Sequence, residues 1–254
     1  MRIKKAYGRR TVQELLQSSI RVQSIDVIDS VESKKLSQII ELAESKRIPI
    51  VKRDRKMLDQ IINATFHQGI IAHYETPTPW DLADLVRHAK KVDHCSLLIF
   101  DGIQDPQNLG AVIRSAEVLG AAGVIIRKKR SAELNSVAMK ASAGSAFRLP
   151  VVIVANLDQT VRLLKKNGYW IYGLDTEGSS SIWETEFSGH TAFVMGNEEV
   201  GISKLLQKRC DNLIHIPQRG KVGSLNVSVA TGIVMAEWLR QSTSANAYIQ
   251  GESK

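Results

Sequence analysis

From Ser96 onwards, short apolar runs alternate with segments of helical periodicity. The runs contain few polar residues, which is typical of parallel strands buried on both faces of a sheet. The sequence therefore predicts an α/β domain whose mostly parallel sheet carries helices on both faces. The predicted strands are Leu97–Phe100, Val124–Ile126, Val151–Val154, Trp170–Leu174, Ala192–Met195 and Leu213–Ile216, and the predicted helices are Asn108–Leu119, Val137–Ala143, Leu157–Lys166, Ser203–Lys208 and a last one running through Trp238 to Arg240.

Three of these strands run into polar, glycine-containing turns that each open a helix, within residues 100–114, 193–203 and 214–233. Because the carboxyl ends of parallel strands lie at one edge of a sheet, we expect the three turns to converge on one site. Gly220 and Gly223 carry no side chain, so the last turn lets a ligand approach the backbone closely. The sequence thus predicts a binding site assembled from three distant loops.

Residues 1–75 show the shorter pattern of a separate, small α/β unit. Two prolines within Thr76–Trp80 forbid regular helix or central strand, which indicates an extended connection. We predict domains at residues 1–75 and 95–241, a linker at 76–94 and a disordered polar tail at 242–254. The first unit is predicted to contain helices Tyr7–Ser18, Ser33–Ser45 and Met57–Ala64 and strands Val22–Ile28, Ile48–Val51 and Gly69–Tyr74, and the linker is predicted to contain a helix at Asp81–Lys90.

The net charge of +8 is weighted towards the N-terminal part of the chain. Residues 1–75 hold 14 Lys and Arg against 9 Asp and Glu, whereas residues 95–254 hold 17 against 14. This distribution favours a polyanionic partner such as RNA, although a cationic surface that only maintains solubility fits nearly as well. The Lys52–Lys56 run is either a phosphate contact or a solvated loop, and His67 is either an RNA contact or a turn residue with partners inside the protein.

Missing features exclude several classes of protein. The chain contains neither G-x-G nor G-x-x-x-x-G-K-[ST], so we expect no Rossmann dinucleotide site, no glycine-rich loop of the ordinary methyltransferases and no P-loop. No apolar run reaches the roughly 18 residues of a membrane span, and no signal-peptide pattern follows Met1–Lys5, which predicts a cytoplasmic protein. Cys95 and Cys210 are far apart without C-x-x-C spacing, so we expect reduced, structural thiols and no metal site.

The polar turns carry three motifs, namely Asn108–Arg114, Gly196–Glu198 with Gly201, and Ser224–Ala230. In their order and spacing they resemble the motifs of the SpoU (TrmH) branch of the SPOUT RNA 2'-O-ribose methyltransferases. The first unit, through Tyr7–Gly8 and His67–Ile70, resembles the small RNA-binding domain of the RlmB-type 23S rRNA guanosine methyltransferases. The resemblance therefore extends over most of the chain.

The resemblance implies a fold that periodicity does not reveal. It implies a deep trefoil knot in the C-terminal domain, an exception to the rule that chains do not thread their own loops, and a ribosomal-protein-like fold for the N-terminal unit. It implies S-adenosyl-L-methionine as the cofactor, held in a bent form and contacted by Gly196, Ile216 and Leu225. It also implies a homodimer with the cofactor site near the subunit interface, where Arg114 serves a shared site.

The implied reaction transfers a methyl group from a sulfonium to a ribose 2'-hydroxyl, which requires in-line placement and stabilisation of the hydroxyl oxygen. By the resemblance, Arg114 activates the hydroxyl and Asn108 holds its orientation. A guanidinium stays protonated at neutral pH, so we expect Arg114 to bind the adjoining phosphate and stabilise the developing oxyanion. Glu198 either orients a donor in the site or only stabilises a helix N-terminus. Ser224 and Asn226 either contact the ribose or cap the last helix.

Two features depart from the family pattern. Glu199 stands where the family commonly has glycine, and the Arg219–Lys221 turn is more basic than expected. The predicted activity is S-adenosylmethionine-dependent 2'-O-methylation of a guanosine in 23S rRNA. The alternatives are a tRNA or resistance-type rRNA methyltransferase of the same branch and, from another class, a non-catalytic RNA-binding or ribosome-assembly protein. The presence of all five candidate catalytic residues weighs against the non-catalytic protein.

Overall fold

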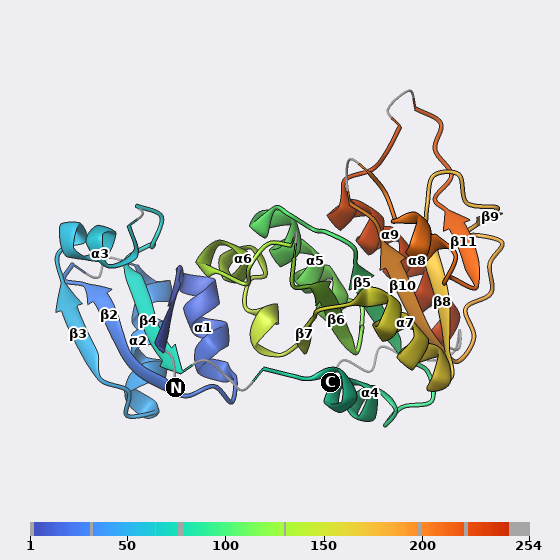
Figure 1. Ribbon diagram of the computed structural model, residues 1–254. Coiled ribbons are helices and arrows are strands. Elements are labelled where there is room, and N and C mark those ends of the chain that lie inside the picture. Colours follow the sequence, from blue (N-terminus) through green and yellow to red (C-terminus); the bar gives the residue numbers. More distant parts are fainter. Residues whose placement is uncertain are drawn as a thin grey trace.

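The computed structural model describes residues 3–30, 33–63, 65–75, 79–129, 131–197, 200–220 and 223–243. These residues form two α/β units that lie side by side, each with its own sheet (Figure 1). The predictions for Glu198, Glu199 and Lys221 fall outside the described residues, as do linker residues 76–78 and tail residues 244–254.

The N-terminal unit is built on a four-stranded mixed sheet. Its elements are β1 (Ile3–Tyr7), α1 (Arg9–Gln17), β2 (Val22–Ile28), α2 (Lys34–Ser45), β3 (Ile50–Arg53), α3 (Arg55–Ile62) and β4 (Ile70–Glu75). The strand order is β1-β4-β2-β3, with β4 antiparallel to both of its neighbours and β2 parallel to β3. Apolar faces of α1, α2 and the sheet form one core, which includes Leu15, Ile25 and Ile39.

The sequence analysis missed β1 and wrongly assigned Tyr7 to a helix. β1 reads Ile-Lys-Lys-Ala-Tyr, and only its last two residues are buried, so the strand shows little apolar alternation. Its pairing with β4 makes it a strand, which is information that lies about seventy residues away in the sequence. Gly8 has a φ of 89°, a conformation that favours glycine, and α1 begins directly after it at Arg9. The other predicted elements of this unit are present.

The second unit is built on a seven-stranded sheet in which every pair is parallel. Its elements are α4 (Leu82–Ala89), β5 (Ser96–Phe100), α5 (Pro106–Val118), β6 (Gly123–Arg127), α6 (Ser136–Ala141), the 3-10 helix η1 (Ser145–Phe147), β7 (Val151–Val154), α7 (Leu157–Lys166), β8 (Tyr169–Leu174), β9 (Ser180–Ser181), β10 (His190–Met195), α8 (Lys204–Gln207), β11 (Asn212–His215) and α9 (Val227–Ser242). The sequence analysis missed β9 and η1, which are too short to show a period.

The strand order β7-β6-β5-β10-β8-β11-β9 determines where a site can form. β6 and β7 follow β5 on one side of it, and the later strands lie on its other side, where β10 pairs with both β5 and β8. Ligands of open parallel sheets bind at the carboxyl ends of the strands where the strand order reverses. The β5, β10 and β8 ends meet at such a point.

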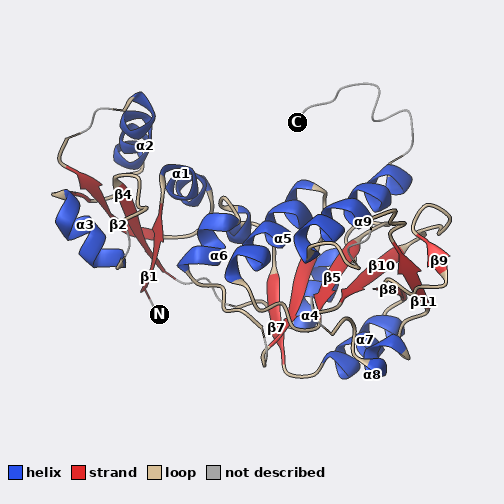
Figure 2. Cartoon of the chain, turned by 90° about the horizontal axis from the view of Figure 1, so that it is seen from above, coloured by secondary structure: helices blue, strands red, loops and turns tan. Residues whose placement is uncertain are grey.

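Helices cover both faces of this sheet, as predicted (Figure 2). On one face α5, α6 and α9 pack over a core that includes Phe100, Phe193 and Trp238. On the other face α4, α7 and α8 pack over a core that includes Leu97 and Ile171. The predicted α/β class with a parallel sheet is therefore confirmed. None of the helices in the described ranges is both long and apolar enough to span a bilayer.

The two units contact each other through α6 and η1. Phe147 of η1 packs against the N-terminal core, and its ring meets that of Tyr74 edge-on with centroids 5.5 Å apart. Lys140 of α6 places its Nζ 5.4 Å from the Tyr7 ring centroid and donates to the carbonyl of Phe66. These apolar and cation–π contacts hold the N-terminal unit against the second unit.

Arg148 adds an ionic connection between the units. Its Nη1 donates to Glu14 of α1 at 2.5 Å and its Nε donates to Glu117 of α5 at 2.8 Å. We expect Arg148→Ala to destabilise the contact by about 1 kcal/mol or less, because the side chain is 41% exposed and water screens the charges. Calorimetry should show the N-terminal unit unfolding earlier, whereas Arg162→Ala, which breaks an ion pair within α7, should not change that transition. An identical shift in both variants would contradict this expectation.

Both cysteines are free, with Cys95 buried and Cys210 partly buried. Burial raises the pKa of the Cys210 thiol to about 12 and also raises the pKa of Cys95. Cys95 Sγ lies 3.2 Å from His190 Nδ1, but burial lowers the pKa of His190, so a neutral imidazole faces a protonated thiol.

A raised thiol pKa reduces the fraction of reactive thiolate at any pH below it. We therefore expect both native thiols to react with an aromatic disulfide reagent at about pH 8 far more slowly than the unfolded protein, and to react faster as the pH rises. Stopped-flow absorbance measures the two rates. Native thiols that react as fast as unfolded ones would show that neither is structural in the predicted sense.

Candidate active site

A cavity of about 510 Å³ lies at the carboxyl ends of β8, β10 and β11. This is within the usual size of small-molecule sites. Strand ends form one part of its wall, and the turn before α9 forms another. The lining residues are Leu174, Asp175, Thr176, Glu177, Met195, Gly196, Asn197, Val200, Gly201, Gln207, Ile214, His215, Ile216, Gln218, Gly223, Ser224, Leu225, Val227 and Ala230.

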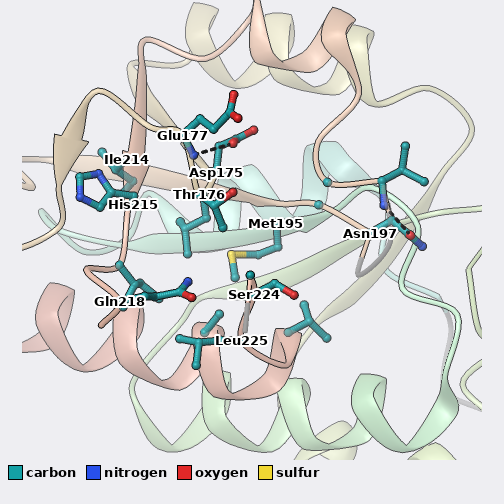
Figure 3. Close-up of a pocket in the computed structure, with 18 of the residues that line it drawn as sticks. Asp175, Thr176, Glu177, Met195, Asn197, Ile214, His215, Gln218, Ser224 and Leu225 are labelled. Carbon is teal, nitrogen blue, oxygen red and sulfur yellow. Dashed lines mark hydrogen bonds between the residues drawn. The ribbon is translucent and has the colours of Figure 1, made fainter. Parts of the chain in front are cut away.

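The lining combines apolar side chains with a few polar groups. Asp175, Thr176 and Glu177 lie on one side of the cavity, and Ser224 and Leu225 lie on the other (Figure 3). Apolar walls suit the adenine and the methionine chain of S-adenosylmethionine, and the hydroxyl, amide and carboxylate groups suit its ribose and its amino acid end. The residues present therefore fit the predicted cofactor.

Gly196 occupies a position where no side chain fits. A Cβ atom on Gly196 would lie 2.2 Å from the carbonyl carbon of Gly201 and 2.4 Å from the backbone nitrogen of Ile202. Asn197 and Gly201 exchange backbone hydrogen bonds at 3.0 and 2.9 Å, which holds these two residues of the loop after β10 side by side. The absence of a side chain at Gly196 thus allows this loop to form one wall of the cavity.

The turn before α9 brings the third motif to the same cavity. Ser224 and Leu225 line it, together with Ile216 from the end of β11. Asn226 accepts a hydrogen bond from the Ser228 backbone nitrogen at 2.9 Å, so it caps α9 as one of the two expected roles requires. All three residues expected to contact the cofactor, Gly196, Ile216 and Leu225, are brought together in this lining.

A side-chain hydrogen bond joins the first motif to the third. Asn226 Nδ2 donates to Asn108 Oδ1 at 3.1 Å, although the two residues are 118 positions apart. Asn108 lies in the first turn of α5, which packs beside α9, so the bond ties two helix N-termini together next to the cavity. The structure therefore brings Asn108 close to the site without placing it in the cavity lining.

Arg114 is not brought into the cavity. It is exposed on α5 and absent from the lining, and its side chain makes no hydrogen bond or ion pair with the described residues. Asn108 and Arg114 are six residues apart, which turns their side chains to different sides of the helix. Glu198, the other expected charged residue, falls outside the described residues.

The sequence analysis missed a polar group at the end of β8. Asp175, Thr176 and Glu177 follow a strand that the sequence predicted, and all three line the cavity. Asp175 is held in place because its carboxylate accepts from Gln207 Nε2 at 2.8 Å and from the Glu177 backbone nitrogen at 3.0 Å. Polar residues directly after a buried parallel strand were the available signal, since such strands end at one edge.

No cluster of three or more His, Cys, Asp or Glu side chains suited to a metal ion occurs among the described residues. The polar groups at the cavity are carboxylates, amides and hydroxyls of the kind that recognise ribose and amino acid groups.

Comparisons with known proteins cover both units. The model of the SpoU rRNA Methylase family matches residues 96–236, and the model described as RNA 2'-O ribose methyltransferase substrate binding matches residues 5–80. The 23S rRNA (guanosine-2'-O-)-methyltransferase RlmB of Escherichia coli strain K12 is 40% identical over 236 residues, which is 92% of this chain and 97% of the relative.

Solved structures share the fold. The SpoU methyltransferase AviRb from Streptomyces viridochromogenes, in complex with the cofactor AdoMet, is similar with a TM-score of 0.78 at 25% identity, covering 93% of this chain and 89% of that one. The TrmH/SpoU tRNA modifying enzyme of A. aeolicus is similar with a TM-score of 0.53 at 26% identity, covering 66% of this chain and 91% of that one. The predicted family and enzyme class are confirmed: this chain belongs to the SpoU rRNA methylase family.

Proposed function

We propose that this protein is an S-adenosylmethionine-dependent methyltransferase that modifies the ribose 2'-hydroxyl of a guanosine in 23S rRNA. The observation that carries the proposal is the 40% identity to an enzyme named for this reaction, which extends over both units of the chain. The cavity supports it, because it gathers residues from the second and third motifs at one edge of the sheet.

S-adenosylmethionine supplies an electrophilic methyl group when bound. The protein's own contribution is mainly positioning, because aligning two reactants removes much of the barrier to their reaction. Gly196, Ile216 and Leu225 hold the cofactor, and the apolar lining excludes water from it. The bonded pair of Asn108 and Asn226 fixes the edge of the site where the ribose enters, with Ser224 beside it.

Arg114 binds the phosphate beside the target ribose and stabilises the negative charge that develops on the 2'-oxygen as its proton leaves. Glu198 orients a donor in the same site. Because Arg114 is exposed on α5 and lies outside the cavity lining, it meets a bound nucleotide at a site that a second subunit helps to form. The active form is therefore a homodimer, and the exposed Val118 on α5 and Val229 on α9 supply apolar surface for its interface. Light scattering of the purified protein measures the oligomeric state.

The N-terminal unit, residues 1–75, is the RNA-binding domain, residues 76–94 are the linker and residues 95–241 form the methyltransferase domain. The C-terminal domain contains the trefoil knot of the SPOUT enzymes, and the insertion of β10 between β5 and β8 is consistent with such a threaded path. The enzyme works in the cytoplasm, where ribosomal RNA is modified in bacteria such as those of the relatives.

A tRNA substrate is the second candidate. The tRNA-modifying relative matches 66% of this chain, whereas the rRNA methyltransferase relative matches 92%. The additional N-terminal unit therefore favours ribosomal RNA. A resistance-type rRNA enzyme and a non-catalytic RNA-binding protein remain outcomes of the test.

The test is methylation of purified ribosomal RNA and transfer RNA with radiolabelled S-adenosylmethionine, followed by mapping of the modified ribose. We expect label in one guanosine of 23S rRNA. Label in tRNA, or in a different nucleotide of rRNA, would assign one of the other methyltransferases. Absence of both label and cofactor binding in titration calorimetry would identify a non-catalytic protein.

A further inference from the structure

The turn that follows β5, at Asp101 and Gly102, holds the loop that forms one wall of the cavity. We propose that Asp101 is a positioning residue, which keeps the described residues of the loop after β10, 196–197 and 200–203, in the arrangement that binds the cofactor. This inference rests on the proposed function only in identifying the ligand of the cavity. The contacts themselves lie within the described parts of the two segments.

The turn is bonded to the loop at three places along its length. The backbone nitrogen of Asp101 donates to the carbonyl of Met195 at 2.9 Å, just before the loop. Asn197 Nδ2 donates to the carbonyl of Gly102 at 2.8 Å, within the loop. Asp101 Oδ2 accepts from the backbone nitrogen of Ser203 at 3.2 Å, at the end of the loop. One turn thus holds both ends of the loop.

The surroundings of the Asp101 carboxylate strengthen the hydrogen bond that it accepts. Its side chain is 6% exposed, and its other oxygen, Oδ1, lies 3.4 Å from Arg127 Nη1 at the end of β6. A buried carboxylate with a cationic partner accepts stronger hydrogen bonds than a neutral group does. Removing it takes away the acceptor of the Ser203 nitrogen in a hydrogen bond that is partly buried.

The position of the loop matters to the cavity and to catalysis alike. Gly196, Asn197, Val200 and Gly201 line the cavity, so the bonds to Asp101 and Gly102 set where this wall stands. The same turn continues into α5, which begins at Pro106 and carries Asn108 and Arg114. Asp101 therefore connects the cofactor wall to the helix that carries the first motif.

The test compares two buried aspartates with the same kind of partner. Asp26 in the N-terminal unit also has a side chain that is 6% exposed, and it is paired with a similarly exposed arginine, Arg53. We expect Asp101→Ala to raise the Kd for S-adenosylmethionine about 10-fold, which corresponds to the loss of one partly buried, charge-assisted hydrogen bond, while Asp26→Asn leaves it within about twofold. Titration calorimetry measures both values. Wild-type affinity in Asp101→Ala would overturn the proposal.

Two further measurements separate positioning from simple stabilisation. Arg127→Met should raise the Kd for the cofactor less than Asp101→Ala does. The double variant should have nearly the same Kd as Asp101→Ala alone, because Arg127 acts through Asp101. Asp101→Asn, which retains one acceptor oxygen, should speed hydrogen exchange of the Ser203 amide in the cofactor-free protein, and Asp26→Asn should not. If Asp101→Ala does not fold, the exchange rate of the Ser203 amide in Asp101→Asn tests whether Asp101 positions the loop.

Hydrogen exchange keeps the two proposals distinguishable. If the wild-type protein binds no S-adenosylmethionine, the proposed function fails, while faster exchange at Ser203 in Asp101→Asn still supports the role of Asp101. If the wild-type protein binds the cofactor but exchange and Kd are both unchanged in Asp101→Asn, the role of Asp101 is wrong and the proposed function stands.

Discussion

Gly196→Ala is expected to weaken binding of S-adenosylmethionine severely. The added Cβ would lie 2.2 Å from the carbonyl carbon of Gly201 and 2.4 Å from the Ile202 nitrogen, and both are backbone atoms that cannot turn aside as a side chain can. The loop must move away, and it carries Val200 and Gly201 of the cavity lining with it. We expect the Kd to rise by on the order of 100-fold or more, as for severe overpacking of a rigid site.

The matched control is Gly232→Ala in α9, where a Cβ would meet nothing within 4 Å. This variant should fold and bind S-adenosylmethionine as the wild type does, because alanine favours a helix more than glycine does. Titration calorimetry compares the two variants, and circular dichroism establishes that each is folded. Wild-type affinity in a folded Gly196→Ala protein would show that the loop after β10 is not a wall of the cofactor site.

Arg114→Ala is expected to lower kcat by roughly 10²- to 10³-fold, the usual effect of removing one group that stabilises an oxyanion. Cofactor affinity should hardly change, because Arg114 is not part of the cavity lining. Arg114→Lys should remain strongly impaired, since an ammonium cannot reproduce the two-pronged contact of a guanidinium with phosphate. Single-turnover methylation of 23S rRNA with saturating cofactor measures the rate of the chemical step.

Arg162→Ala serves as the control for the loss of an exposed helical arginine, because α7 lies on the opposite face of the sheet from α5. It should methylate RNA at the wild-type rate. Full activity of Arg114→Lys would defeat the view that the guanidinium holds phosphate and oxyanion together. Activity of Arg114→Ala that is restored by mixing with a second inactive variant, such as Gly196→Ala, would show that the site is shared between subunits.

The sequence predicted the second unit well because its signals are local. β5 and β10 are apolar along nearly their whole length, and such runs identify buried parallel strands wherever they pair. The same reasoning failed at β1, where two lysines leave little apolar alternation and pairing with β4 makes the strand. It also failed at the two-residue β9, which exists because Ser180 and Ser181 lie beside β11.

The residues of the candidate site likewise divide into those that the sequence predicted and those that only the structure revealed. Gly196, Ser224 and Leu225 lie in continuous motifs, and the resemblance that these motifs carry identified them together with Ile216 at the end of the preceding strand. The contribution of Asp175, Thr176 and Glu177 was missed because it depends on β8 lying next to both β10 and β11. The predicted orientation of Arg114 by Asn108 stays a prediction, since the two side chains leave the helix in different directions and an RNA substrate or a second subunit would have to bring them to one site.

By itself the sequence determined the two-unit plan, the succession of strands and helices and the three loops that carry the chemistry, since residue period and glycine spacing act over a few neighbouring positions. Only the tertiary structure decided which loops line the same cavity, that Asn226 bonds to Asn108 across 118 positions, and that Asp101 bonds to Ser203 across 102 positions. These arrangements follow from the order of strands in the sheet, which results from packing among distant segments and leaves no mark on local periodicity.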